Sequence, residues 1–279
     1  MKNPLNVDFT GKVVVITGAG GVLCSAIAKA VAQTGAKVAL LGRTLKKLQV
    51  VEEAILAEGG MAKSYACNVL EKDSLEKTHK KILEDLGPCD ILINGAGGNN
   101  PIATTDQEFY TEGCQGKTFF DLDQASVESV FSLNFMGTVL PSQVFAVDMI
   151  GRPGCSILNI SSMNAYTPLT KIPAYSGAKA AISNLTQWMA TYFSKVGIRC
   201  NAIAPGFFAT EQNHALLFNA DGSLSARSEK ILRNTPMDRF GDPEELVGAC
   251  LFLMCEEASG FINGVIIPID GGFCAYAGV

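Results

Sequence analysis

The first forty residues contain the pattern that most restricts how this chain can fold. A short, nearly continuous apolar run, Lys12–Thr17, leads directly into a glycine-rich segment, Gly18–Ser25, and then into a helix-like apolar periodicity that reaches Gln33. A second apolar run follows at Lys37–Leu41. Strands that are apolar throughout are typical of a parallel sheet buried on both faces. The pattern therefore predicts a βαβ unit whose glycine turn presents backbone N–H groups at a helix N-terminus, which suits a pyrophosphate.

The same alternation continues to the end of the chain. We expect strands near 12–17, 37–41, 62–67, 89–94, 154–160, 199–204 and 264–269. We expect helices near 21–34, 44–58, 71–86, 123–148, 173–196, 225–234 and 242–255. This order predicts an α/β fold: a doubly wound, Rossmann-like parallel sheet of about seven strands with right-handed crossovers. Because no linker or repeat interrupts it, residues 1–279 are predicted to form a single domain.

A Tyr-x-x-x-Lys step at Tyr175 and Lys179 lies in a segment that is predicted to be helical, with Ser162 thirteen positions before the tyrosine. Residues four apart share a helix face, so the phenol and the ammonium can reach one cleft. A phenol has a pKa of about 10, and lowering it by ~3 units requires about 4 kcal/mol of interaction with a nearby cation. The spacing thus fits a tyrosine acid/base, although each of these residues alone is more often structural.

Taken together, the ordered motifs resemble those of the short-chain dehydrogenase/reductase family. The matching segments are Thr17-Gly18, Asn94–Gly97, Asn134, Ser162, Tyr175 with Lys179, Pro205-Gly206 with Thr210, Arg239–Glu245 and Ile269–Gly272. The resemblance implies an NAD(P)-dependent oxidoreductase. Two departures stand out: Val22 and Cys24 replace the last two glycines of the family's first loop, and Asn68 replaces an acidic residue beside the adenine. An amide at that position can still hydrogen-bond a ring edge.

The resemblance also implies the catalytic residues, Asn134, Ser162, Tyr175 and Lys179. In reduction, Tyr175 would donate a proton to the developing alkoxide, and Lys179 would bind the nicotinamide ribose and lower the tyrosine pKa. Ser162 would donate to the substrate oxygen, and Asn134 would hold a water beside Lys179. Ser161 competes for the serine role, but the spacing to Tyr175 favours Ser162.

Cofactor contacts are expected along all the glycine-containing motifs. The residues implied by the resemblance are Gly18, Gly20, Gly21, Val22, Leu23, Arg43, Asn68, Val69, Asn94, Gly95, Ala96, Tyr175, Lys179, Pro205, Gly206, Phe208 and Thr210. For Asn94, a purely sheet-stabilising role stays open. NADP(H) is favoured because Gly42 stands where NAD enzymes of the family carry a carboxylate, so Arg43 can pair with a 2′-phosphate. Alternatively Arg43 faces solvent and NAD is used.

Two long connections are expected to form the substrate site: an inserted loop near 98–118 and a substrate loop near 207–234. Loops of this length often act as lids or binding segments. The predicted substrate contacts are Asn99, Asn100, Asn164, Lys171, Gln212 and Asn213. Amides suit a substrate with adjacent hydroxyls, and Lys171 would pair with a carboxylate. The alternative for Lys171, an exposed loop charge, stays equally open.

Several stretches resemble the sugar-acid branch of the family, the D-mannonate oxidoreductase (fructuronate reductase) type. They are 20–24, 98–101, 162–165, 168–173 and 207–213. The sequence thus indicates an oxidoreductase acting on a small polar substrate. Rival interpretations are a 3-oxoacyl-carrier reductase, a gluconate 5-dehydrogenase-like activity, and a non-catalytic dinucleotide-binding regulator. No basic docking patch supports the carrier reductase, and the intact serine, tyrosine and lysine argue against the regulator.

Composition excludes other classes of function. The net charge is −5 with scattered basic residues, so no nucleic-acid surface is indicated. No apolar run of membrane-span length and no signal segment are evident, and nine cysteines without a Cys-x-x-Cys pair predict free thiols in a reducing cytoplasm. Two histidines are too few for a histidine-based metal site. The resemblance implies a homotetramer, with these candidates for intersubunit packing or monomer core: Phe131, Phe135, Phe145, Trp188, Tyr192 and Phe193.

Overall fold

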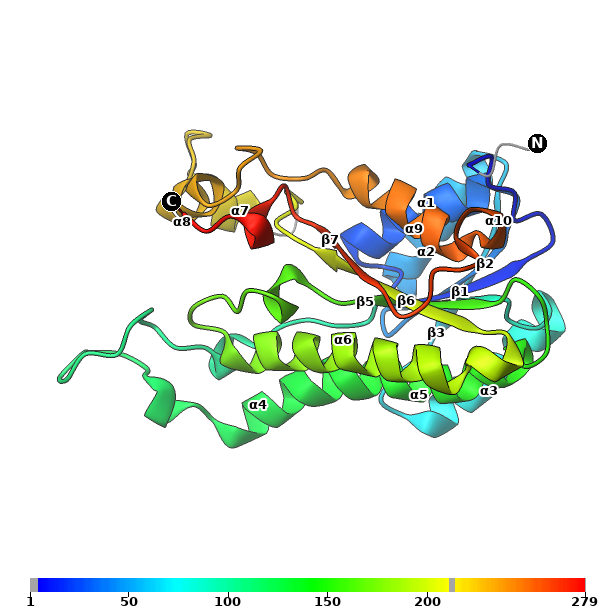
Figure 1. Ribbon diagram of the computed structural model, residues 1–279, viewed down its shortest axis with the longest axis horizontal. Helices are drawn as coiled ribbons and strands as arrows, with labels where there is room; N and C mark the ends of the chain where they lie inside the picture. Colours follow the sequence, from blue (N-terminus) through cyan, green and yellow to red (C-terminus); the bar gives the residue numbers. More distant parts are fainter. Residues whose placement is uncertain (1–4, 211–213, 279) are drawn as a thin grey trace.

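A seven-stranded, all-parallel sheet forms the centre of the protein. The computed structural model describes residues 5–210 and 214–278. The strand order is β3-β2-β1-β4-β5-β6-β7 (Figure 1). The strands are β1 Val13–Thr17, β2 Lys37–Gly42, β3 Met61–Ala66, β4 Ile91–Asn94, β5 Ser156–Ile160, β6 Arg199–Pro205 and β7 Ile266–Ile269. The predicted α/β class and the predicted strand number are confirmed, and each strand lies within two residues of its expected position.

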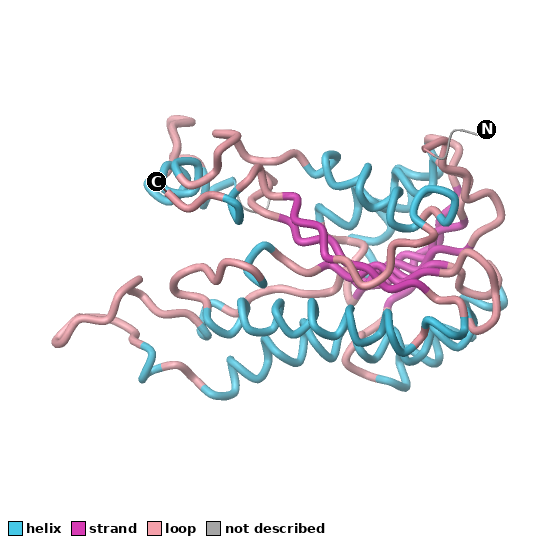
Figure 2. The backbone as a smooth tube through the Cα atoms, viewed as in Figure 1, coloured by secondary structure: helices cyan, strands magenta, loops and turns pink. Residues whose placement is uncertain are grey.

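Helices cover both faces of the sheet, as Figures 1 and 2 show. One face carries α1 Val22–Gln33, α2 Leu45–Ala57, α9 Val247–Met254 and α10 Glu256–Ser259. The other carries α3 Lys72–Asp85, α4 Gln124–Phe131, α5 Gly137–Phe145 and α6 Pro173–Tyr192. Beyond the strand ends lie α7 His214–Leu217 and α8 Ala226–Arg233. Short 3-10 turns are η1 Pro101–Ala103, η2 Phe119–Asp121, η4 Ala146–Met149, η5 Met163–Ala165, η6 Ser194–Val196, η7 Pro243–Leu246 and η8 Phe273–Ala275, and η3 Ser132–Met136 is a π turn.

The apolar run of β1 explains why the sheet is buried on both sides. All five of its residues are buried. Because side chains alternate along a strand, Val14 and Ile16 face the core beneath α1, α2 and α9, whereas Val13 and Val15 face the core beneath α3, α5 and α6. A strand with only one apolar face could not bridge two such layers.

The helix expected near 123–148 is present but is not uniform. It runs from Gln124 to Met149 as α4, the π turn η3, α5 and η4. This 26-residue run is long and apolar enough to cross a membrane, although no such run was expected from the sequence. Half of its most apolar window is buried inside the protein, as in a core helix.

The strand order reverses between β1 and β4, which are neighbours in the sheet. The connections after these two strands therefore leave toward opposite faces, and a crevice opens at their carboxyl ends. Thr17, Asn94, Ile160 and Pro205 end β1, β4, β5 and β6 at this edge. Most of the motifs identified in the sequence converge here.

Candidate active site

Thr17 fastens the glycine loop to the segment after β4. Its side chain is fully buried, and its Oγ1 accepts hydrogen bonds from the Gly95 N–H at 3.0 Å and the Ala96 N–H at 3.2 Å. Gly18 follows with φ +67, and a Cβ there would lie 2.8 Å from the Gly95 carbonyl oxygen. The two glycine motifs are therefore in direct backbone contact, which no side chain at Gly18 would permit.

The N-terminus of α1 suits a negatively charged group. The helix begins at Val22 after Gly21, and no side chain caps its first backbone N–H groups. Its first turn contains no acidic residue. The free donors and the positive end of the helix dipole therefore suit the pyrophosphate of a dinucleotide, beside the predicted contacts Gly18, Gly20 and Gly21.

Cys24, which replaces a family glycine, is accommodated by Gly95. The buried Cys24 thiol lies 3.9 Å from the Gly95 carbonyl oxygen, and a Cβ on Gly95 would come within 2.2 Å of the Cys24 Sγ. Burial raises the pKa of the thiol to about 11, so it stays protonated at neutral pH. In the family, a glycine at the position of Cys24 leaves room between α1 and the segment after β4. Here Gly95, on that segment, provides the room instead.

Asn94 has the sheet-stabilising role that the sequence left open. Its side chain is buried and donates to Ser142 Oγ and Asn159 Oδ1, both at 2.9 Å, and Asn159 donates in turn to Thr186. Asn68 is also engaged locally, since its Nδ2 donates to Glu71 at 2.7 Å and its Oδ1 accepts from the Leu70 N–H. Buried amide chains of this kind fix neighbouring strands and helices relative to one another.

Arg43 is exposed at the end of β2 and lines a pocket on the cofactor side of the crevice. The rest of the lining is Leu70, Gly98, Asn99, Asn100, Pro101, Ser129, Val130 and Leu133. Val69, next to this pocket in the chain, is buried. The predicted substrate residues Asn99 and Asn100 thus share a pocket with Arg43. The Asn100 side chain is occupied, because it caps η1 and donates to Ser129 Oγ.

The two adjacent serines after β5 face different partners. Ser161 Oγ donates to the Lys179 carbonyl at 3.2 Å and lies 2.7 Å from Ser183 Oγ, so it is directed into α6. Ser162 Oγ instead accepts from the Asn164 N–H at 3.2 Å and hydrogen-bonds with Tyr175. The arrangement favours Ser162 over Ser161 for contact with a substrate, in line with the prediction from spacing.

Tyr175 and Lys179 lie together at the first turns of α6. The half-buried Tyr175 has its pKa raised above the ordinary value by burial, which outweighs the hydrogen bond with Ser162. Burial also lowers the pKa of Lys179 to about 8. The expected lowering of the tyrosine pKa by the lysine is not found, because the ammonium donates to the Ile160 carbonyl at 2.8 Å and lies 5.6 Å from the ring centre.

Asn134 lies on the π turn η3 and is completely buried. Its Nδ2 donates to the carbonyls of Gly98 and Val130 at 2.7 and 2.8 Å. A Cβ on Gly97 would lie 2.7 Å from the Asn134 Oδ1 and 3.3 Å from the Lys179 Nζ. Because Gly97 has no side chain, the Asn134 amide and the Lys179 ammonium can both lie close to its backbone. Single π turns inside helices occur often at functional sites.

Pro205 and Gly206 join the end of β6 to β7. The Gly206 N–H donates to the Ile269 carbonyl at 2.8 Å, and a Cβ at Gly206 would lie 2.6 Å from Asp270. Phe208 is buried in the core with its ring against Gly241, so a cofactor contact there would have to come from its backbone. Thr210 is half-buried. The glycine again permits a close backbone approach.

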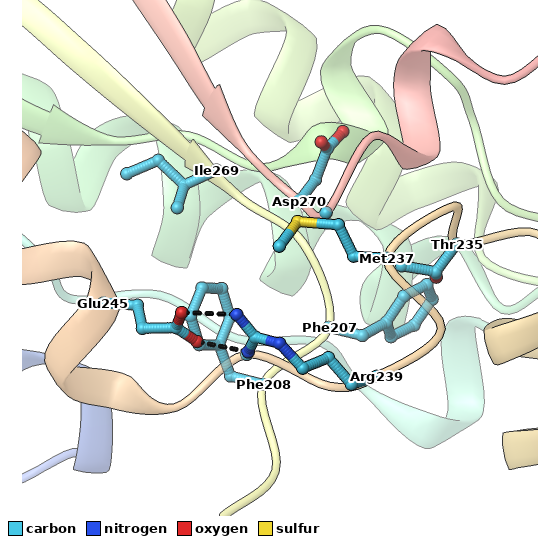
Figure 3. Close-up of a pocket in the computed structure, with 10 residues that line it drawn as sticks. Phe207, Phe208, Thr235, Met237, Arg239, Glu245, Ile269 and Asp270 are labelled. Atoms are coloured by element: carbon cyan, nitrogen blue, oxygen red, sulfur yellow. Dashed lines mark hydrogen bonds and ion pairs between the residues drawn. The ribbon is translucent and has the colours of Figure 1, made fainter.

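A second pocket beside these residues contains none of the predicted catalytic side chains (Figure 3). It is lined by Phe207, Phe208, Thr235, Met237, Arg239, Gly241, Glu245, Ile269, Asp270 and Gly271. Arg239 and Glu245 form two parallel hydrogen bonds of 2.6 Å within it. The pair fastens the start of η7 to the preceding loop. The two charges neutralise each other, so the family motif at 239–245 has a structural role here.

The remaining predicted substrate residues differ in their exposure to solvent, and two of them lie outside the described residues. Asn164 is buried, and its Oδ1 has no hydrogen-bond partner among the described residues. Lys171 is half-buried and adopts φ +72, a conformation that is uncommon for a residue with a side chain. Gln212 and Asn213 lie outside the described residues. Within the parts of the chain that the structure describes, no cluster of His, Cys, Asp or Glu could hold a metal ion.

Comparison with known proteins decides which family this geometry belongs to. The short chain dehydrogenase model matches residues 12–219. The chain is a member of that family. It is 59% identical to an uncharacterized oxidoreductase of Haemophilus influenzae, over 98% of this chain and 97% of the relative. It is 34% identical to the gluconate 5-dehydrogenase of Gluconobacter oxydans, over 98% of each chain. The protein is thus an oxidoreductase of the short-chain dehydrogenase type.

A solved structure supports the same conclusion and identifies a class of cofactor. A Haemophilus influenzae protein, provisionally named a D-mannonate oxidoreductase and crystallised with NAD, superposes with a TM-score of 0.96. It shares 58% identity, and 99% of each chain is covered. The site described above therefore belongs to an enzyme that binds a nicotinamide cofactor.

Three contacts around the site were not predicted from the sequence. They are the buried Thr17 hydroxyl between the glycine motifs, the Ser161–Ser183 pair beneath Lys179, and the fit of Cys24 against Gly95. The substitution of a loop glycine by Cys24 was visible in the sequence as a departure. Its compensation was not, because Cys24 and Gly95 are far apart in the chain.

Proposed function

We propose that this oxidoreductase reduces the keto group of a hexuronate-type keto acid to the corresponding aldonate. The observation that carries the proposal is the arrangement of Ser162, Tyr175 and Lys179, with Ser162 hydrogen-bonded to the tyrosine and the lysine ammonium 5.6 Å from its ring centre. Support for a sugar acid comes from the relatives that act on gluconate and from the solved neighbour assigned to D-mannonate.

When bound, the nicotinamide cofactor supplies the hydride. Ser162 orients the substrate oxygen: its Oγ accepts the Asn164 N–H, and the hydroxyl hydrogen that it directs to Tyr175 can turn to the substrate oxygen. Tyr175 transfers a proton to the same oxygen, and its raised pKa keeps it protonated for this step at neutral pH. Lys179, with a pKa of about 8, is charged at neutral pH, and its ammonium, held at the Ile160 carbonyl, would bind the nicotinamide ribose. The Asn134 side chain is engaged by Gly98 and Val130, so the water proposed to return the proton to the lysine would be held by the Asn134 backbone.

Recognition of the substrate carboxylate is assigned to Lys171. The residue follows β5 and η5 and precedes α6, the segments that carry Ser162 and Tyr175. Its left-handed backbone conformation is the kind of local strain that occurs at functional sites. Asn164, with its unpaired buried oxygen, is the amide best suited to a substrate hydroxyl.

The test compares Lys171→Ala with wild type on a hexuronate and on a neutral ketose. The variant should raise KM for the uronate at least ~10-fold and leave the ketose within ~2-fold, because only the acid loses an ion pair. An equal change for both substrates would remove the assignment. Faster turnover of acetoacetyl thioesters than of any sugar acid by the wild type would replace the proposal with an acyl reductase.

For the cofactor, we propose a preference for NADP(H), with NAD(H) also accepted. Gly42 leaves no carboxylate to repel a 2′-phosphate, and Arg43 is exposed in the pocket on that side. The 58% identical neighbour contains NAD, whereas a 26% identical gluconate 5-dehydrogenase of Burkholderia cenocepacia contains NADP. The cofactor bound in each crystal structure is a property of that neighbour.

We further propose a cytoplasmic homotetramer. All nine cysteines are free, which suits a reducing compartment, and Cys67, Cys89, Cys155 and Cys200 are buried. Trp188 and Tyr192 stack at 4.7 Å while remaining more than half exposed, which favours them for subunit packing. Phe145 is fully buried and belongs to the monomer core instead. A monomeric mass by light scattering would contradict the assembly.

The second candidate is a gluconate 5-dehydrogenase-like activity, which the 34% identical relative favours. The two keto acids carry the keto group at the same carbon and differ in the configuration of a hydroxyl group. Both would use the same serine, tyrosine and lysine. Turnover of 5-keto-gluconate and fructuronate with NADH and NADPH, compared by kcat/KM, separates them.

A further inference from the structure

The connection after β4 is an arm, residues 98–121, whose base packs against the catalytic helix. Ala103 is completely buried in a small apolar cluster with Val130 of α4 and Ala174 of α6, and Tyr175 packs against the same cluster. The Thr105 N–H donates to the Lys171 carbonyl at 2.9 Å. The arm is therefore attached both to the helix that carries the proton donor and to the loop that precedes it.

Internal hydrogen bonds hold the two limbs of the arm together. The Asp106 N–H donates to the Lys117 carbonyl at 2.8 Å, and the Lys117 N–H donates to the Asp106 carboxylate at 2.7 Å. The Lys117 ammonium reaches back to the Ile102 carbonyl at 2.9 Å. Gly116 allows this close approach, because a Cβ there would lie 2.5 Å from the Asp106 carboxylate. These bonds give the residues just beyond Asp106 a defined position.

Glu108 extends from this position and forms an ion pair with Lys230 of α8. Lys171 is a further positive charge close to Glu108, and together the two lysines hold the pKa of the carboxyl group below its usual range. Figure 1 shows the arm and α8 on opposite sides of the same end of the molecule, beyond the sheet edge where the strands end. The ion pair thus joins the connection after β4 to the connection after β6.

Other contacts continue this chain of linked segments. The Tyr166 hydroxyl, in the connection after β5, donates to the Ile266 carbonyl of β7 at 2.7 Å. The Cys274 thiol, in the segment after β7, lies 3.6 Å from the Met163 carbonyl. The connections that follow β4, β5, β6 and β7 are therefore all tied to one another around the end of the sheet that holds Ser162 and Tyr175.

We infer that the Glu108–Lys230 ion pair closes the outer side of the substrate site and makes the enzyme select small ketones over bulky ones. The inference rests on the proposed roles of Ser162 and Tyr175, which place the substrate inside this ring of segments. Both partners are partly accessible, with 28% of the Glu108 side chain and 59% of the Lys230 side chain exposed. Exposed ion pairs are weak, so the link can open and close during turnover.

The first experiment measures closure without any substrate. Phe109 and Tyr110 are 78% and 62% exposed on the arm, which makes them chymotrypsin sites. Lys230→Gln leaves the arm sequence intact but removes the cation that pairs with Glu108. Because the arm is then less restrained, chymotrypsin should cleave at these residues about threefold faster. The matched control is Lys63→Gln, which breaks the similarly exposed Lys63–Asp85 pair on β3 and α3 and should leave arm cleavage unchanged. Arm cleavage at the wild-type rate in Lys230→Gln would overturn the inference.

The second experiment measures selectivity. We compare kcat/KM for 5-keto-gluconate with that for a 7-oxo bile acid, a bulky ketone, in Glu108→Gln, Lys230→Gln and the charge-reversed pair Glu108→Lys/Lys230→Glu. Each single variant should shift the ratio toward the bulky ketone by about threefold, and the reversed pair should restore it. An unchanged ratio, or an equal shift in Lys63→Gln, would overturn the inference. Absence of turnover with every ketone would contradict the proposed function, while the proteolysis result would still decide whether the ion pair closes the arm.

Discussion

The proposed cofactor side and the proposed substrate side of the crevice are built in different ways. On the cofactor side, the buried Thr17 hydroxyl and the backbone of Gly18 contact the backbone of Gly95, at the ends of β1 and β4. On the substrate side, Glu108, Lys171 and Lys230 come from three connections that are distant in the chain, and they interact through partly exposed charges. The cofactor side tolerates little change in side-chain volume, whereas the substrate side depends on weaker contacts that can vary without loss of the fold.

The strongest test of the comparison lies at the boundary between the two sides, at Tyr175. Tyr175→Phe should lower kcat at least ~100-fold and leave the Kd of the reduced cofactor within ~3-fold, because the variant loses the proton donor and keeps the ring. Cofactor fluorescence and steady-state kinetics measure the two effects. A variant that keeps more than about a tenth of the wild-type kcat would show that another group supplies the proton.

On the cofactor side, the packing of Gly95 should be sensitive to a single methyl group. Gly95→Ala places a Cβ 2.2 Å from the Cys24 Sγ and 2.9 Å from the Thr17 carbonyl oxygen, so it should lower the free energy of unfolding by about 3 kcal/mol. Adding Cys24→Ala removes the closer of the two clashes and should recover about half of the loss. Urea titration of the two variants measures the recovery, and strict additivity of the two substitutions would contradict the assigned contact.

Lys179, which we propose to be catalytic, should lower the stability of the fold. Its pKa of about 8 lies below the ordinary 10.5, so folding is penalised while the lysine is charged, by about 3 kcal/mol. Lys179→Met also loses the hydrogen bond to Ile160, which offsets about 1 kcal/mol. The free energy of unfolding of the variant at pH 7 should therefore be about 2 kcal/mol higher than that of wild type. The variant should also be inactive.

The pH dependence of stability gives a second measure of Lys179. Between pH 8 and 10.5 the unfolded chain binds the proton and the folded chain does not. The contribution of Lys179 to wild-type stability consequently rises with pH across this interval. Subtracting the curve of Lys179→Met isolates that rise. A difference that stays flat from pH 8 to 10.5 would show that the lysine is not buried as a charged group.

The smallest expected effect is at Arg43, which is exposed although it lies on the cofactor side. Arg43→Ala should reduce kcat/KM for NADPH by about tenfold and change that for NADH by less than ~2-fold, since only NADPH carries the 2′-phosphate. Kinetics with both cofactors measure the change. A wild-type enzyme that prefers NADH tenfold would refute the NADP(H) preference.

The difference between the two sides also explains what the sequence could predict. The βαβ unit and the order of strands follow from local periodicity and from glycines placed between elements, as at Gly18 and Gly206. The choice of Ser162 over Ser161 followed from its spacing to Tyr175. The ion pair of Glu108 with Lys230 could not be found this way, because nothing local relates a charge on the arm to one on α8. The raised pKa of Tyr175 depends on burial and on the direction of the Lys179 ammonium, which only coordinates provide.

The contact between Cys24 and Gly95 has a consequence for how each position tolerates substitution. A side chain at position 95 would collide with the thiol at position 24 and with the Thr17 carbonyl oxygen. The cost of a substitution at 95 therefore depends on which residue occupies position 24. The two positions are epistatic, and a mutational scan of either one alone would misjudge what the other allows.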